Sequence, residues 1–266
     1  GVFEGQRLFN PQNISYFDQD DNFNLHRLEI VGDDTLNPGK GDGAFVPMNW
    51  NRKTYLQGKL IYRHSPFTKL KYTLINDDVS YQDYNRMYRY NPDGNLKRYR
   101  YGLTQLLQLN HTFSTKTFLN AGITHFKKSY QHRTYDRDKW DQYVHPKLLN
   151  SQPYSFLTGG TDLSVFSRET STSTFKADLT SQWNSKNKIK LGVEFRQHQL
   201  NFNDYSLRPP DEKASFNELS DDPFLGNPQR FPDSTIYSST YNFKPIEFSA
   251  YVQDKIELNE LIINLG

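Results

Sequence analysis

The chain has no cysteine among its 266 residues. This absence excludes disulfide frameworks, thiolate zinc sites and cysteine nucleophiles. No run approaches the roughly 18 to 20 consecutive apolar residues that a membrane-spanning helix needs. An excess of one charge is also missing, because 32 Lys and Arg are interspersed with 30 Asp and Glu. That mixture disfavours a nucleic-acid binder, and we expect no nucleic-acid partner.

Motifs for catalysis and for metal binding are missing as well. The seven histidines show no His-Glu-x-x-His or comparable ligand spacing, and no Gly-x-Ser-x-Gly occurs. Gly159-Gly160 lacks the Lys-Ser/Thr of a phosphate loop. The segment 18–29 partly imitates a calcium loop, but Phe23 stands where that loop needs Gly, so a calcium site and a solvated acidic loop both stay open. We predict no enzyme activity, no cofactor and no metal site.

Two-residue alternation of apolar and polar side chains is what the chain has in abundance. Over residues 175–183 one set reads Phe, Ala, Leu, Ser, Trp and the other Lys, Asp, Thr, Gln. Residues 189–196 repeat the pattern, with Ile, Leu, Val, Phe against Lys, Gly, Glu, Arg. Successive residues of a strand point to opposite faces, so these segments predict strands with one apolar and one polar face.

Short and long connections alternate along the chain. Turn-like sequences occur near 65–68, 114–117, 184–187 and 258–260. They predict hairpins from strands at 55–64 with 69–76, 99–113 with 118–130, 172–183 with 188–202, and 241–257 with 261 onward. The polar segments 77–98, 131–171 and 203–240 predict long loops. One further strand is predicted at 2–9, followed by a long loop through Trp50.

This rhythm is typical of an outer-membrane barrel, in which short turns face the periplasm and long loops face outside. We therefore predict an all-β, antiparallel up-and-down transmembrane β-barrel segment of about eight or nine strands. Aromatic residues make up 15% of the chain, as the two interfacial girdles of a barrel would require. Phe113 and Trp183 lie beside short turns, where such aromatics are favoured. The expected location is the outer membrane, with lipid as a partner.

The charged residues decide which face meets lipid. A charge facing the bilayer midplane costs roughly 2 to 4 kcal/mol, whereas a charge in a water-filled lumen costs little. Asp254 is an exception on the apolar face, explained either by hydration near the interface or by a β-bulge. Glu247 and Lys255 are also assigned to the lumen. The candidate lumen-lining residues are Lys176, Asp178, Lys190, Glu194, Arg196 and His198. The residues assigned to lipid are Phe175, Ala177, Leu179, Ile189, Leu191, Val193, Phe195, Phe248, Ala250 and Val252.

Aromatic residues in the predicted loops are candidates for substrate capture, because Tyr and Trp make large amphipathic contacts at low entropic cost. Interfacial anchoring and loop-to-loop packing explain them equally well. These candidates are Tyr81, Tyr84, Tyr88, Trp140 and Tyr143.

The end of the chain carries two short segments in succession, Tyr251-Val252-Gln253-Asp254 and Asn264-Leu265-Gly266. These segments resemble the TonB-dependent outer-membrane receptor family. In that family a strand reading approximately Tyr-x-Gln-Asp leads through a tight turn into an apolar strand that ends Asn-Leu-Gly. The likeness is greatest to large receptors that carry a carboxypeptidase-regulatory-like domain before the plug.

The resemblance implies a parent barrel of roughly 22 strands, filled by an N-terminal plug and energised through a TonB box. Residues 1–266 would then belong to one barrel domain. The chain starts without Met and stops inside the alternation of Leu261, Ile263 and Leu265, so we expect a mid-barrel piece. The implied function is import of a scarce or bulky nutrient, of the siderophore, glycan or peptide class, with TonB as partner.

Two other interpretations remain open at this point. A passive eight-stranded outer-membrane barrel would account for the long loops. A soluble all-β glycan-binding or structural module would bury the apolar faces of two sheets against each other and leave the charged faces outside. Periodicity alone does not separate the second alternative from a barrel.

Overall fold

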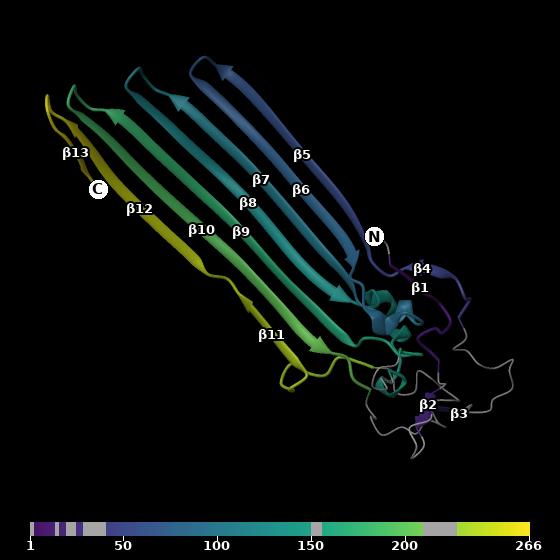
Figure 1. The fold of residues 1–266 in the computed structure, drawn as a ribbon. Coiled ribbons are helices and arrows are strands. Elements are labelled where there is room, and N and C mark those ends of the chain that lie inside the picture. Colours follow the sequence, from purple (N-terminus) through teal and green to yellow (C-terminus); the bar gives the residue numbers. More distant parts are fainter. Residues whose placement is uncertain (1–2, 14–15, 20–24, 29–40, 150–155, 210–227) are drawn as a thin grey trace.

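The computed structural model describes residues 3–13, 16–19, 25–28, 41–149, 156–209 and 228–266. Its main element is an antiparallel sheet of nine strands, whose long strands run side by side in a single layer (Figure 1). The order is β13-β12-β10-β9-β8-β7-β6-β5, and β11 also pairs with β10. The predicted all-β antiparallel fold is confirmed.

The strands of the main sheet occupy most of the chain. Their bounds are β5 (Trp50–Ser65), β6 (Thr68–Gln82), β7 (Lys97–Thr112), β8 (Thr117–Arg133), β9 (Ser164–Gln182), β10 (Asn187–Ser206), β11 (Ser238–Phe243), β12 (Ile246–Glu257) and β13 (Ile262–Leu265). Two small sheets pair β1 (Glu4–Gln6) with β4 (Phe45–Pro47) and β2 (Tyr16–Gln19) with β3 (Leu25–Leu28). The long loops hold the 3₁₀ helices η2 (Arg86–Tyr88), η3 (Pro92–Gly94), η4 (Arg137–Gln142) and η5 (Pro146–Leu148).

All four predicted hairpins are present, and their short turns gather at one end of the sheet while the long loops and small sheets gather at the other (Figure 1). The strands are longer than predicted, since β9 begins at Ser164 and β10 continues to Ser206. The added residues are mostly polar, with Ser, Arg, Glu, Thr and Ser at 167–171 on β9 and Asn and Asp at 203–204 on β10. They carry no regular apolar alternation, and sequence reasoning assigned them to loops.

Two predicted strands differ from the structure. Residues 2–9 were expected in the main sheet, but β1 instead pairs with β4 in a separate sheet, with Gly5 opposite Val46. The strand predicted at 241–257 is divided into β11 and β12 at Pro245. Proline has no N–H to donate to the ladder. The register nevertheless continues through the break, because Phe243 pairs with Leu200 and Ile246 with Gln197.

Register continuity fixes the two faces of the sheet. The apolar face carries a row of seven side chains that are direct cross-strand partners and are each 38–71% exposed. From β5 to β12 the row consists of Leu60, Tyr72, Leu107, Ile123, Phe175, Phe195 and Phe248. The opposite face, which we call the polar face, carries Lys176, Glu194 and Arg196. Pairing between β10 and β12 shows no register shift, so a bulge does not explain Asp254, which lies opposite Ile189.

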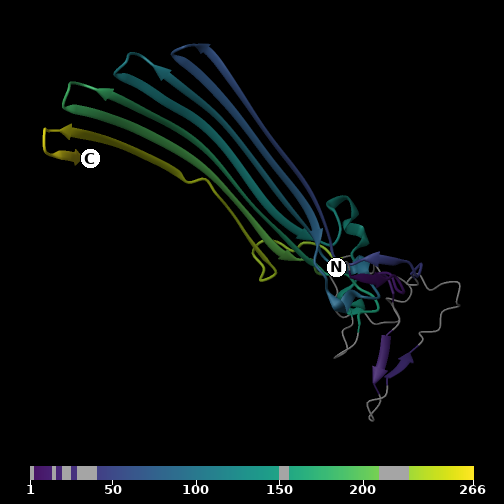
Figure 2. The ribbon, with the colours of Figure 1, turned by 45° about the horizontal axis from the view of Figure 1, so that its top comes forward.

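The hairpins are staggered in one direction across the sheet. The last residue pair before each short turn can be followed across the strand pairings to a position at β10. For the four turns in chain order, these positions are Leu191, Lys190, Lys188 and Lys186. The strands also bend together along their length (Figure 2). A consistent stagger of this kind is the shear that a sheet needs before it can close into a barrel.

The buried core lies beside the long loops, not under the middle of the sheet. One cluster joins Tyr143 with Leu163, Val165, Tyr205 and Leu207 at the loop ends of β9 and β10. A second cluster consists of Met48, Tyr88 and Leu157. The loops therefore form a packed cap at one end of the strands.

Candidate functional site

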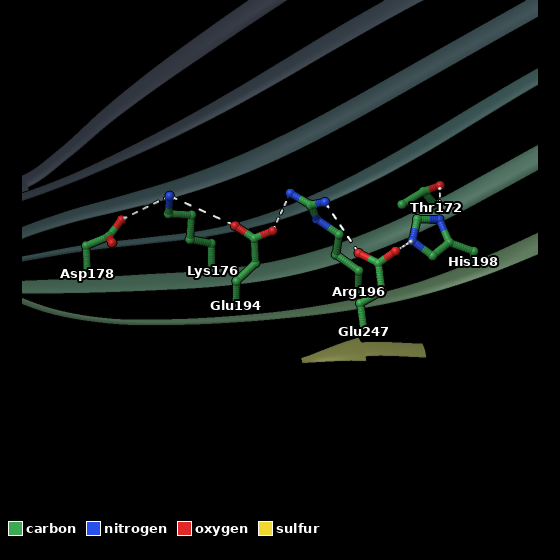
Figure 3. A network of polar contacts seen from close by, with 7 residues as sticks. All are labelled: Thr172, Lys176, Asp178, Glu194, Arg196, His198 and Glu247. Atoms are coloured by element: carbon green, nitrogen blue, oxygen red, sulfur yellow. Dashed lines mark hydrogen bonds and ion pairs between the residues drawn. The ribbon is translucent and has the colours of Figure 1, made fainter. Parts of the chain in front are cut away.

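Three strands bring the predicted lumen residues together on the polar face. Lys176 and Asp178 lie two positions apart on β9, so both point to the same side. On β10, Glu194 is the direct partner of Lys176, and Arg196 is the partner of Glu247 on β12. These side chains form the charged network of Figure 3.

The network starts with Lys176, which lies between two carboxylates. Its Nζ is 3.8 Å from Asp178 Oδ2 and 4.0 Å from Glu194 Oε2. Arg196 contacts Glu194 through its Nη2 and lies 3.5 Å from Glu247 Oε2 through its Nη1 (Figure 3). Positive and negative groups therefore alternate along the network.

His198 ends the network on the side of the long loops. Its Nε2 lies 3.5 Å from Glu247 Oε1, and its Nδ1 is within 2.9 Å of Thr172 Oγ1. The ring is held between a carboxylate and a hydroxyl (Figure 3).

Lys190 is connected to the charged network through the side chain of Tyr251. The Tyr251 hydroxyl donates a hydrogen bond of 2.6 Å to Asp178 Oδ1, and Lys190 Nζ lies 5.5 Å from the centroid of the Tyr251 ring. Gly192 stands between Asp178 and Tyr251 in the register. A Cβ on Gly192 would overlap the Tyr251 ring and come within 2.8 Å of Asp178 Oδ1. The tyrosine reaches the carboxylate because this position has no side chain.

The network is held together by ion pairs within β10 and between side chains of neighbouring strands. The partners are partly exposed, so each pair contributes about 0.2–1 kcal/mol and can be replaced by a pair with a ligand. The candidate residues contribute three cations (Lys176, Lys190, Arg196), against the carboxylates Asp178, Glu194 and Glu247. Among the described residues no group of His, Asp or Glu is arranged to hold a metal ion.

Sequence reasoning placed all six candidates on one face, and the register confirms that placement. It assigned Glu247 to the same face but did not include it among the site residues, and it missed Tyr251 and Thr172. Glu247 and Tyr251 lie in the same alternation as Lys255 on β12, so their face could have been read from the sequence. Their partners could not, because partners depend on the register between strands.

The aromatic candidates occupy different environments. Tyr81 lies on β6 and not in a loop, which corrects the prediction, and Tyr84 is exposed just after that strand. Tyr88 and Tyr143 are buried in the two loop clusters, where burial raises the pKa of each phenol. The Tyr143 hydroxyl accepts hydrogen bonds from the N–H groups of Thr134 and Tyr135. Packing is thus the role that these two residues have in the structure.

The remaining sequence signals fall in the loops. Trp140 belongs to η4, and its side chain lies outside the described part of the chain. Half of the calcium-like segment 18–29, residues 20–24 and 29, also lies outside the described residues. Gly160 has φ +84° and packs against the backbone of Leu149, and its carbonyl accepts a hydrogen bond from Asn91 Nδ2. This glycine pair is therefore part of the packed cap.

No family model, curated protein or solved structure matches this chain. None of the helices in the described segments has the length and apolar character to cross a membrane.

Proposed function

We propose that the nine-stranded sheet is part of the wall of an outer-membrane β-barrel and that its apolar face contacts lipid. The observation that carries the proposal is the exposed row from Leu60 to Phe248. Exposed apolar patches of this extent are rare on soluble monomers and mark contact with a membrane or partner. The apolar face runs from Phe175 on β9 to Trp183 directly after that strand, eight steps of about 3.4 Å or roughly 27 Å. The apolar band of an outer-membrane barrel is about 25 Å tall.

Aromatic side chains at the short turns agree with this placement. Phe67, Phe113 and Trp183 each stand at one of three successive turns and are at least 60% exposed. Tyr and Trp rings are favoured at the level of lipid headgroups. Beyond the apolar band, toward the long loops, the face that carries Phe175 and Phe195 becomes polar, with Gln197, Gln199 and Asn201 on β10, which suits strands that leave the bilayer and enter water.

The soluble two-sheet alternative needs a second layer over the apolar row. In the described residues the sheet is a single layer, and the buried clusters lie at its loop end. The passive eight-stranded alternative needs its first and last strands to pair, and β5 and β13 instead stand at opposite ends of the strand order. Both observations favour a wall segment of a larger barrel.

We further propose that this barrel is that of a TonB-dependent receptor, which imports a scarce or bulky nutrient. The support is the resemblance at residues 251–254 and 264–266, which lie in the hairpin of β12 and β13. The polar face then lines a water-filled lumen, in which the network from Asp178 to His198 can exchange ion pairs with a passing solute. No covalent step is required.

Two substitutions of neighbouring residues on β10 test which face of the sheet contacts lipid. Val193→Arg places a charge on the apolar face, at a cost of roughly 2 to 4 kcal/mol near the bilayer midplane, so we expect failure to assemble in membranes. Glu194→Gln changes the polar face and should leave assembly intact. Heat-modifiable migration in outer-membrane fractions, measured for the full-length protein, reports assembly.

The two variants differ by one position in the sequence and therefore serve as each other's control. Equal assembly of both variants would refute the lipid assignment. Equal failure would contradict the assignment of Glu194 to a water-filled lumen, because a face on water tolerates the loss of one charge.

A further inference from the structure

A second group of side chains lies on the polar face, between the charged network and the long loops. It contains aromatic rings from four neighbouring strands, and we call it the ring ladder: Tyr130 and His132 on β8, Phe166 on β9, Phe202 on β10, and Tyr241 and Phe243 on β11. Phe202 is four positions beyond His198 on the same strand, so it shares the face of the network. On β10 the ring ladder therefore follows the charged network directly, on the same face.

The rings contact one another in sequence across the strands. His132 and Phe166 stack with centroids 5.2 Å apart, and Phe166 meets Phe202 edge to face at 5.4 Å. Phe202 and Tyr241 are parallel within 4° at 4.9 Å. Tyr241 and Phe243 are 42% and 61% exposed, so the ladder ends in rings that offer free surface to a ligand.

Cations are interleaved with this ladder. Arg168 is the direct partner of Tyr130 and of Phe202, Arg100 is the partner of Tyr130 on its other side, and Lys128 lies two positions from Tyr130. All three cations are exposed. Arg100 lies 5.7 Å from the Tyr81 ring, but within the described residues none of the three makes an ion pair, unlike Lys127 with Glu169.

The chemistry of these groups restricts the ligand. Lys and Arg donate hydrogen bonds and accept none, so the ligand atoms they bind must be acceptors, and anionic oxygens form the strongest such contacts. Exposed rings favour a planar group, and guanidinium groups also stack on aromatic faces. A neutral sugar would leave the three cations without a counter-charge.

We propose that the ring ladder, with Arg100, Lys128 and Arg168, binds a small anionic solute that carries a planar ring. The inference rests on the proposed function, in which the polar face lines the lumen, and it narrows the substrate class from nutrients in general to ring-bearing anions. The ligand lies on the loop side of the charged network, where a solute entering from outside would meet it first.

Calorimetry of ligand binding to the full-length protein in detergent micelles tests the proposal. The probe is 2,6-naphthalenedicarboxylate, with 2,6-naphthalenedimethanol as the neutral ring, succinate as the charge without a ring, and maltohexaose as a neutral oligosaccharide. We expect the dicarboxylate to bind at least about tenfold more tightly than each of the others, since a charge-assisted contact corresponds to a factor of this order.

Neighbouring lysines provide a matched control. Lys128→Gln and Arg168→Gln should each weaken dicarboxylate binding about tenfold. Lys127→Gln removes a charge from the next position, on the opposite face, and should leave binding unchanged. Tyr241→Leu should reduce the preference for the dicarboxylate over succinate, because it removes ring surface.

Maltohexaose or the neutral naphthalene binding as tightly as the dicarboxylate would overturn the proposal. Equal effects of Lys127→Gln and Lys128→Gln, or no binding of the dicarboxylate, would do the same. These outcomes differ from a failure of the proposed function, which appears as equal assembly of Val193→Arg and Glu194→Gln. A protein that assembles but does not bind the dicarboxylate refutes the ligand class alone.

Discussion

Gly192 shows how one residue decides the geometry of the charged network. Its position in the alternation is equivalent to that of Lys190 and Glu194, so sequence reasoning placed it on the polar face. The reason for glycine there is the crossing of the Tyr251 ring toward Asp178. Alternation within one strand identifies a face, and it gives no information on a contact that joins three strands through their register. The charged candidates were predictable for that reason, and their partners were not.

Replacing Gly192 by valine should displace the Tyr251 ring and break its hydrogen bond to Asp178. We expect a loss of about 1–3 kcal/mol in the free energy of unfolding, as for other overpacked positions. Urea unfolding of the micelle-bound protein, followed by tryptophan fluorescence, measures it. Gly58→Val is the control, because a Cβ at Gly58 meets nothing within 4 Å. Equal losses in both variants would contradict this account of Gly192.

At the scale of elements, strands with one apolar face were predictable and other strands were not. The hairpins of β5 with β6 and of β7 with β8 have apolar alternation near their turns and were found. The loop-side half of β9 is rich in Ser and Thr and carries no such signal. Pro245 was visible in the sequence, but the alternation continues on both sides of it, and the break between β11 and β12 was missed.

Asp233 ties the segment before β11 to that strand. Its carboxylate accepts hydrogen bonds from Ser238 Oγ at 2.8 Å and Thr240 Oγ1 at 3.0 Å, and from Arg230. The hydrogen bonds from Ser238, Arg230 and Thr240 lower the pKa of Asp233. A carboxyl with a lowered pKa stabilises the folded form above its ordinary pKa, and this contribution is lost as the pH falls through the lowered value.

A spin label on Ile236→Cys should therefore gain mobility at acidic pH, below the ordinary range of a carboxyl group. In Asp233→Asn the label should be mobile already at neutral pH, because the charged acceptor is gone. Electron paramagnetic resonance line shapes measure both effects. Identical line shapes of the two proteins at neutral pH would show that Asp233 does not hold this segment.

At the scale of the whole molecule, the apolar row from Leu60 to Phe248 could not be foreseen from any single segment. Each strand contributes one side chain to it, and their alignment depends on six consecutive registers. Local periodicity predicted that each strand has an apolar face. It did not predict that the loops would carry the buried clusters and leave that face open.

The absence of native cysteine allows this arrangement to be measured along β10 with single labelled cysteines. In lipid vesicles, labels at Leu191, Val193 and Phe195 should collide with oxygen dissolved in the bilayer. Labels at Lys190, Glu194 and Arg196 should collide with a water-soluble nickel complex. Labels at Gln197 and Gln199 should meet the nickel complex although they share the face of Val193, because the apolar band ends there. Uniform accessibility across these positions would contradict a wall with lipid on one side.

The stagger of the four hairpins has a geometric consequence for how the molecule stands in a bilayer. The last pairs before the first and the fourth turn project onto Leu191 of β10 and onto Lys186, the residue before β10, a displacement of five residues, or about 17 Å at 3.4 Å per residue. The same turns are separated by six strand spacings of about 4.8 Å, or about 29 Å. If all four turns lie at one depth, the strands lean by about 30° from the membrane normal, close to the 35–45° tilt of closed barrels.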